Sequence, residues 1–204
     1  MHTNNLRSCD ERTVRATMTV VAQISPSDLS LPTPCAGWDL SQLLAHMTAG
    51  HRGFAAAAEG RGADHDVWQT RPLGDNPIQE YARAAESVIT AFAAPDVLER
   101  DFLLPEIAPR PFPGRIAIGF HLLDFVAHGW DVARTIGAPY ELPDDVLAIA
   151  LPIATAVPDG ESRTTPGAAF APRIPDPGGA PLNRILALLG RHTTAATPLS
   201  VPRS

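Results

Sequence analysis

Apolar residues recur at helical spacing in six segments of the chain, and stretches rich in proline and glycine separate these segments. We expect one helix in each segment. Asp39, with Gln42 three residues later, is typical of a capping box before the second helix, and Gly137 is placed to end the fourth. The expected helices span residues 11–24, about 40–59, 77–94, about 115–136, 143–157 (interrupted or begun late because of Pro152) and 180–190.

The remaining segments favour loops and short strands. Residues 97–114 are expected to be extended or irregular, and residues 158–179 to form a loop with a short extended piece near 168–175. Four substantial helices with short strands predict a mostly α fold, a helical bundle with an additional C-terminal helix. At this length we expect one domain over residues 1–192, followed by a flexible tail at 193–204.

The fourth helix contains the most unusual pattern, HLLDFVAHGWD at residues 121–131. On a helical wheel His121, Asp124, His128 and Asp131 share one face, while the other directions are apolar. Imidazole and carboxylate are ligands of borderline divalent metals, and Asp124 and His128 can reach one ion from successive turns. An isolated Asp-x3-His pattern is more often a polar surface or a hydrogen-bonded core, so the metal hypothesis needs a partner from elsewhere in the chain.

The second helix offers such a partner. His46 borders an apolar face, and Gly50 and Gly53 lie on nearly the same side, where small residues would leave space beside the imidazole. Taken alone, His46 is as well explained as a hydrogen-bonded boundary histidine. His51 points elsewhere, and we expect it at the surface or the rim of a site.

Composition narrows the classes of function. All sixteen basic residues are arginine, so a Schiff-base lysine and a Walker-type lysine are excluded. The net charge of −6, without a basic cluster, argues against a nucleic-acid partner. The apolar windows are too short to span a bilayer, the N-terminus does not resemble a signal peptide, and two cysteines make no disulfide framework. We therefore expect a cytoplasmic protein with a small-molecule partner; a homodimer stays open.

Three segments carry a family resemblance: TPCAGWDLSQLLAHM at 33–47, HLLDFVAHGWDVARTIGAPYELP at 121–143 and PLNRILALLGR at 181–191. Together they resemble the mycothiol-dependent maleylpyruvate isomerase metal-binding domain family, the actinobacterial branch of the DinB-like four-helix bundles. The resemblance covers most of residues 11–192.

The resemblance implies a DinB-like bundle that holds a divalent metal, most often zinc, with nickel or iron as alternatives. The implied ligands are His46, Asp124 and His128, and Asp124 stands where the family has glutamate. Because aspartate is one methylene shorter, the ion would sit closer to the fourth helix, or His121 would help to bind it. Cys35 matches the family's TPC cysteine, and we interpret it as a small buried residue rather than a nucleophile.

Three protein ligands leave a coordination position open, which is typical of catalytic metal sites. The resemblance implies activation of a low-molecular-weight thiol, commonly mycothiol, by an isomerase or thiol transferase that acts on a small electrophile. Two alternatives remain: a metal-assisted hydrolase or lyase-like enzyme, and a non-catalytic bundle that binds a metal or a ligand.

Four further residues are candidates for roles beside the metal. His121 or Asp131 could serve as a general base, and Asp131 could instead accept a hydrogen bond from a ligand histidine. Arg52 and Arg134 are candidates, by position in the sequence, for contacts to the thiol at the mouth of a pocket.

Overall fold

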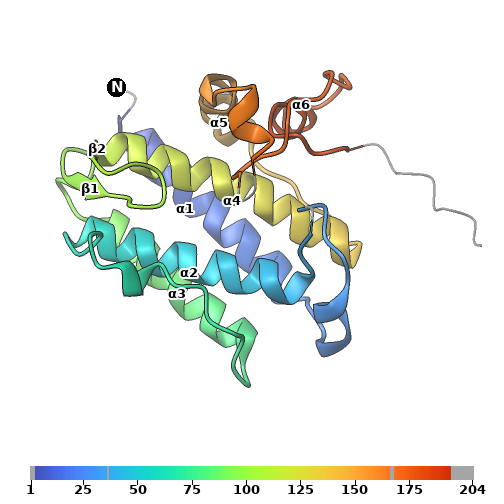
Figure 1. Ribbon diagram of the computed structural model, residues 1–204, viewed down its shortest axis with the longest axis horizontal. Coiled ribbons are helices and arrows are strands. Elements are labelled where there is room, and N and C mark those ends of the chain that lie inside the picture. Colours follow the sequence, from blue (N-terminus) through green and yellow to red (C-terminus); the bar gives the residue numbers. More distant parts are fainter. Residues whose placement is uncertain (1–2, 36, 166–167, 194–204) are drawn as a thin grey trace, which may run out of the picture.

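The computed structural model describes residues 3–35, 37–165 and 168–193 (Figure 1). Helices dominate this part of the chain, joined by a small hairpin and three short 3-10 helices. The α-helices are α1 (Thr3–Val21), α2 (Leu40–Ala58), α3 (Pro77–Phe92), α4 (Gly114–Ile136), α5 (Asp144–Ala156) and α6 (Pro181–Leu188). The 3-10 helices are η1 (Pro26–Ser30), η2 (His65–Val67) and η3 (Glu161–Arg163), and the strands are β1 (Asp101–Leu103) and β2 (Pro111–Pro113).

The first four α-helices form a bundle in which α2 packs mainly on α3 and α1 packs mainly on α4. α5 and α6 pack on each other, with α5 against α4 and α1, and form a separate layer outside the bundle (Figure 1). The predicted mostly α fold, a DinB-like helical bundle with an additional C-terminal helix, is confirmed. Among the described helices, none combines the length and the apolar character that a bilayer crossing needs.

Close approach of α1 and α4 depends on Gly129. A Cβ at this position would overlap the side chains of Thr17 on α1 and Tyr140 after α4. Tyr140 in turn donates a hydrogen bond to the Phe125 carbonyl at 3.1 Å. Glycine at this point therefore lets the helix that carries the His–Asp face lie directly against α1.

Two predicted helices differ from the structure. α1 begins near residue 3 rather than 11, because its first turns also bury side chains such as Cys9, and it ends at Val21, after which Ser25 and Asp28 form a new capping box for η1. α5 runs through Pro152 without interruption. Pro152 lies on the exposed face, so water can satisfy the carbonyl of Ala148 that loses its N–H partner.

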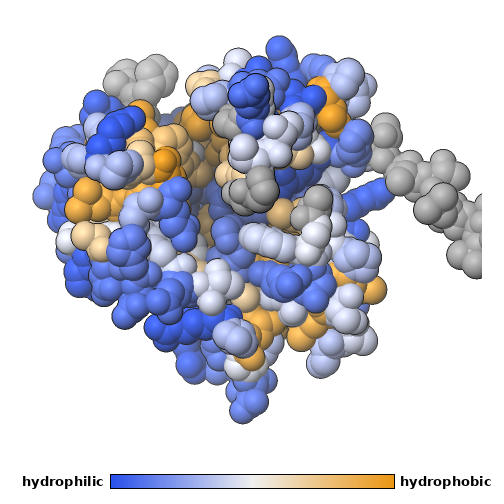
Figure 2. Space-filling model, viewed as in Figure 1, coloured by the Kyte–Doolittle hydropathy of each residue, from blue (hydrophilic) through white to orange (hydrophobic). Residues whose placement is uncertain are grey.

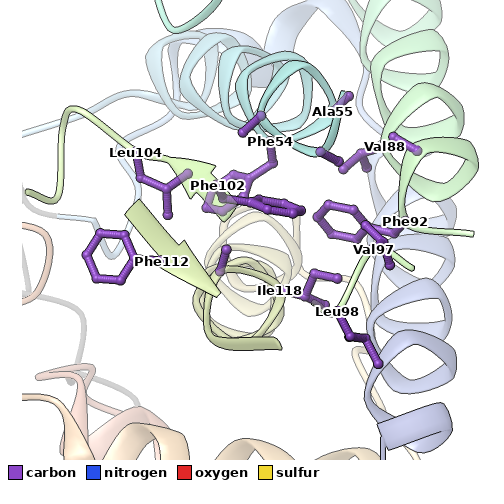
Figure 3. Close-up of a cluster of buried hydrophobic side chains, with 14 of the residues drawn as sticks. Phe54, Ala55, Val88, Phe92, Val97, Leu98, Phe102, Leu104, Phe112 and Ile118 are labelled. Carbon is purple, nitrogen blue, oxygen red and sulfur yellow. The ribbon is translucent and has the colours of Figure 1, made fainter. Parts of the chain in front are cut away.

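The predicted extended region after α3 forms the hairpin, in which Phe102 pairs with Phe112 in antiparallel register. Figure 3 shows how Phe102 gathers with Phe54 and Phe92 in an apolar cluster at this end of the bundle. Large apolar side chains are also exposed near the hairpin, where Figure 2 shows an apolar patch; they are Leu103, Ile107 and Ile116.

Residues 168–175, in the loop between α5 and α6 where a short extended piece was expected, form no paired strand. In place of strand pairing, Arg163 connects this segment to neighbouring parts of the chain. Its buried guanidinium donates hydrogen bonds to the carbonyl oxygens of Pro158, Ala171 and Leu188. Residues 194–204 of the predicted tail lie outside the described residues, and the single domain over 1–192 stays a prediction.

Candidate metal centre

Two helices bring the three predicted ligands together. α2 supplies His46 and α4 supplies Asp124 and His128, and one possible ligand atom from each lies within 4.8 Å of the others. His128 Nε2 and Asp124 Oδ1 are 3.3 Å apart. Two ligand atoms at about 2.1 Å from a tetrahedral ion are separated by roughly 3.4 Å, so this pair already has the spacing of two zinc ligands.

The position of His46 follows from the start of α2. The predicted capping box is confirmed: the Gln42 N–H donates to Asp39 Oδ1 at 2.9 Å, and the Asp39 N–H donates to Gln42 Oε1 at 3.0 Å. The ring of Trp38, just before this cap, lies 4.8 Å from the His46 ring, centroid to centroid. The cap and Trp38 therefore fix His46 on the side that faces His128, whose ring lies 5.3 Å away.

Asp131 orients His128. Its Oδ2 lies 3.0 Å from His128 Nδ1, and both side chains are buried. A carboxylate only accepts hydrogen bonds, so His128 Nδ1 carries the proton and, in the neutral ring, Nε2 carries the lone pair. Asp131 therefore accepts a hydrogen bond from His128, and the role of His128 as a metal ligand stays a prediction.

Arg191, which the sequence analysis did not single out, completes this arrangement. It follows α6 and is buried, and its guanidinium donates to both oxygens of Asp131, at 3.3 Å from Nε and 3.0 Å from Nη2. The pair therefore places no net charge in the interior. The available signal was weak: a single arginine directly after the apolar segment ILALLG.

The charges around the cluster favour a cation. Burial lowers the pKa of His46, so its ring is neutral. Burial also disfavours the charged form of His128, but the neighbouring Asp124 carboxylate outweighs this effect and raises the pKa of His128 to about 9. Burial acts against ionisation of Asp124, yet His128 and His46 hold its pKa below the ordinary value. In the metal-free protein His128 therefore carries a proton that a divalent ion would replace.

Cys35 lies beside the same histidine. Its Sγ, a nitrogen of His128 and an oxygen of Asp131 also lie within 4.8 Å of one another. Burial raises the pKa of the Cys35 thiol to about 11, although Arg191 acts in the opposite direction. Cys35 is therefore a thiol rather than a thiolate at neutral pH, which argues against a role as nucleophile.

A surface pocket of about 860 Å³ adjoins the cluster, because His46 forms part of its wall. This volume is within the range of small-molecule sites, about 300–1,000 Å³. Leu29, Trp38 and Leu73 supply apolar walls, and Arg71 supplies a cationic group that the sequence analysis missed. His46 and Arg71 therefore both line this pocket.

The other predicted site residues lie elsewhere. Neither Arg52 nor Arg134 belongs to the pocket wall: Arg52 lies 3.6 Å from Glu80, and Arg134 is exposed near the end of α4. The structure does not place His121 in the ligand cluster either. It is fully buried, and both ring nitrogens contact other side chains, Asp10 and His51.

The expectation of a surface position for His51 is wrong, because His51 is fully buried in contact with Phe125. Gly53 also differs from its interpretation. A Cβ there would overlap the ring of Trp68, so Gly53 makes room for this ring rather than for space beside His46.

The residues fit a divalent metal on structural grounds. Two imidazoles and a carboxylate form a donor set that suits zinc, His128 is held in the tautomer that coordination through Nε2 requires, and a pocket reaches His46. In zinc enzymes a set of three protein ligands leaves a position for water or substrate.

Comparison with known proteins points in the same direction. A family model described as mycothiol maleylpyruvate isomerase N-terminal domain matches residues 11–133. Two relatives from Mycobacterium tuberculosis, the uncharacterized proteins MT0763 (strain CDC 1551) and Rv0738 (strain H37Rv), are each 29% identical to the chain over 185 residues. The match covers 89% of this chain and 94% of each relative. No solved structure matches the chain significantly.

Proposed function

The chain belongs to the mycothiol maleylpyruvate isomerase N-terminal domain family, and from this premise we propose that it is a metal-dependent enzyme that uses a low-molecular-weight thiol. Mycothiol is the proposed thiol, and the proposed reaction is isomerisation of, or S-transfer to, a small electrophile. The observation that carries the proposal is the convergence of His46, Asp124 and His128 beside a pocket of about 860 Å³.

Zinc is the proposed ion, with nickel and iron as the alternatives, and His46, Asp124 and His128 are its proposed ligands. When bound, a divalent ion would stabilise a thiolate or polarise a carbonyl group of the substrate. Asp131 keeps the Nδ1 proton on His128 and so keeps Nε2 available to the ion, while Arg191 holds the Asp131 carboxylate in place.

Charge balance supports an anionic thiol ligand. Asp131 and Arg191 cancel, and the two ligand histidines are neutral once His128 has lost its extra proton. A divalent ion together with the Asp124 carboxylate therefore leaves one positive charge. An anionic ligand, such as a thiolate, would neutralise this charge, whereas a neutral ligand would leave it uncompensated in a largely buried site.

The side chains of the protein support a thiol from outside the chain. Cys35 is the cysteine beside the cluster, and burial keeps its thiol protonated because the pKa is raised to about 11. In the pocket, Arg71 can bind a carboxylate of the substrate, and Trp38 and Leu73 can exclude water from one side of it. Direct contacts of Arg52 and Arg134 with the thiol, a homodimer and a cytoplasmic location stay predictions.

The first test is the metal content of untagged protein by elemental mass spectrometry. The set is wild type, His128→Ala and the control His65→Ala, which removes an exposed histidine of η2. We expect about one zinc per chain in wild type and in the control, and loss of the ion in His128→Ala. Equal metal content in all three proteins, or no metal in wild type after reconstitution with zinc, nickel and iron, would overturn the proposed site.

The second test concerns the thiol. Calorimetric titration of zinc-loaded protein with mycothiol is expected to show binding that His128→Ala loses, and mycothiol is expected to be required for turnover of maleylpyruvate or another small electrophile. Metal binding without any effect of mycothiol would reject the thiol-dependent reaction. It would favour a hydrolase or a non-catalytic metal-binding bundle instead.

A further inference from the structure

Three buried side chains form a line through the bundle next to the candidate metal centre. Asp10 on α1, His121 on α4 and His51 on α2 have exposed fractions of 1%, 0% and 0%. Asp10 Oδ1 lies 2.7 Å from His121 Nδ1, and His121 Nε2 lies 3.1 Å from His51 Nδ1. Helices from distant parts of the sequence thus bring one carboxylate and two imidazoles into direct contact in the core.

When both rings are neutral, the order of the contacts determines which ring nitrogens of His121 and His51 carry a proton. An ionised Asp10 only accepts, so His121 Nδ1 is the donor and His121 Nε2 is the acceptor. His51 Nδ1 must then donate to His121 Nε2, which leaves His51 Nε2 as a bare acceptor. Among the described residues, no hydrogen-bond partner of His51 Nε2 is found, although this atom is fully buried. A buried polar atom without a partner is costly, and a water molecule or another polar group would be needed to satisfy it.

The side chains that surround His51 and His121 are mostly aromatic and apolar, so a charge in this region would lie on Asp10, His121 or His51. The ring of His51 stacks on Phe125 at 3.9 Å, and the rings of Phe54 and Phe92 lie 5.0 and 5.1 Å from His121. Figure 3 shows Phe54 and Phe92 in the apolar cluster at this end of the bundle. With two neutral histidines, an ionised Asp10 would have no positively charged partner inside this line of three residues, which is costly in such apolar surroundings.

Other ionisable groups near the line come from three helices. The hollow of about 250 Å³ between α1 and α3 that Asp10 reaches is also lined by Arg7 and Glu11. Tyr81 on α3 packs against His51, and burial raises the pKa of this phenol, so it is neutral. The charge of Asp124 on α4 acts on His51 and favours its protonated form.

We propose that Asp10, His121 and His51 form a proton-holding cluster, in which His51 Nε2 takes up a proton inside the bundle and the positive charge comes to rest on His121 beside Asp10. Burial lowers the pKa of His51 well below its ordinary value, and the neighbouring His121 adds to this effect. A proton therefore does not stay as a charge on His51. His121, in contact with the Asp10 carboxylate, forms an ion pair when it accepts the charge.

The proposed step consists of the uptake of one proton from outside the cluster and the transfer of a second proton within it. The added proton binds to His51 Nε2, and the proton of His51 Nδ1 passes to His121 Nε2 across the 3.1 Å contact. His51 is then neutral in the other tautomer, His121 carries a proton on each nitrogen, and Asp10 remains ionised and accepts from His121 Nδ1. Release of the proton reverses both transfers. Uptake of one proton thus converts His51 Nε2 from an acceptor into a donor.

The cluster is placed to serve the metal centre, a use that rests on the proposed function. His51 is five residues from His46 on α2, about 7.5 Å of helix rise, and His121 is three residues from Asp124 on α4. A thiol must lose a proton to become a thiolate. In this use the cluster holds the proton in the interior until the product is protonated.

The test measures the protonation states of His51 and His121 directly, in full-length protein without metal or thiol. The two-bond ¹H–¹⁵N spectra of ¹⁵N-histidine protein distinguish both tautomers and the doubly protonated ring. Over a titration from about pH 5 to 9, we expect His51 to change tautomer and His121 to gain a proton with one shared midpoint. In Asp10→Asn this midpoint should move to lower pH, because the carboxylate that pairs with the positive charge is lost. Glu11→Gln, which removes a carboxylate from the same hollow, should leave it unchanged.

The wild-type spectra decide the matter even if a variant fails to fold. A His51 ring that keeps one tautomer throughout the titration, or that titrates independently of His121, would overturn the proposal. The result does not depend on the metal, since zinc content is measured separately. If wild type binds no zinc but His51 and His121 still share one midpoint, the proposed function is rejected and the proton-holding cluster is retained.

Discussion

His128 Nδ1 and Asp131 Oδ2 lie 3.0 Å apart within one turn of α4, while the other nitrogen of the same ring lies 3.3 Å from Asp124. One imidazole is therefore held between two carboxylates. Arg191 compensates the charge of Asp131, so Asp124 is the carboxylate left to neutralise a cation at Nε2. In the metal-free protein that cation is the proton of His128, and in the proposed enzyme a divalent ion takes its place.

This relationship predicts how zinc affinity depends on pH. The pKa of His128 is raised to about 9, so below this pH zinc must displace one proton. The apparent affinity should increase about tenfold per pH unit from about pH 7 to about pH 9, and should level off above. His46 adds no second proton in this range, because its pKa is lowered. Competition with a chelator of known proton affinity measures the slope; an affinity independent of pH would contradict the assignment of His128 as a protonated ligand.

Replacing Asp131 by asparagine tests its role as a positioning residue. An amide no longer fixes the proton on His128 Nδ1, so the ring can turn or change tautomer, and zinc affinity should fall about 10–100-fold. Asp145→Asn, at an exposed carboxylate of α5, is the matched control. Chelator competition gives the affinity, and the ¹⁵N-histidine spectrum shows the tautomer of His128 directly. Unchanged zinc affinity in Asp131→Asn would exclude the positioning role.

Arg191→Met tests the buried ion pair. Removing the guanidinium takes away the two hydrogen bonds that Arg191 donates to Asp131 and leaves the buried carboxylate with His128 as its remaining partner. The unfolding free energy should fall by about 3–5 kcal/mol. Arg184→Met, at an exposed arginine of α6 that lies 3.5 Å from Asp176, should cost less than about 1 kcal/mol. Urea denaturation of the two variants measures the difference. Similar losses in both would show that Arg191 contributes no more than a surface arginine.

Local patterns in the sequence predicted much of the fold. Asp39 and Gln42 form the expected capping box, and Gly137 ends α4 with a φ of 70°, in the left-handed region that glycine adopts most easily. Both features depend on residues a few positions apart. They therefore require no knowledge of which helices meet.

Residues whose environment comes from distant segments could not be predicted in this way. A helical wheel places His121 on the same face as Asp124 and His128 but does not show its level along the bundle, where Asp10 of α1 and His51 of α2 meet it instead. Arg191 contacts Asp131 sixty residues earlier in the chain. No periodicity in the sequence indicates such a pairing.

The two glycines of α2 make a matched pair for the last prediction, since the sequence analysis gave both the same role. A Cβ at Gly53 would overlap the Trp68 ring, so Gly53→Ala should displace this ring and lower the unfolding free energy by about 1–3 kcal/mol. At Gly50 a Cβ would come no closer than 3.9 Å to Phe125, an ordinary contact, and Gly50→Ala should stabilise the helix by about 0.5–1 kcal/mol. Urea denaturation and tryptophan fluorescence measure the stability and the displacement of Trp68. If Gly50→Ala destabilises the protein as much as Gly53→Ala, space beside His46 rather than the packing of Trp68 accounts for both glycines.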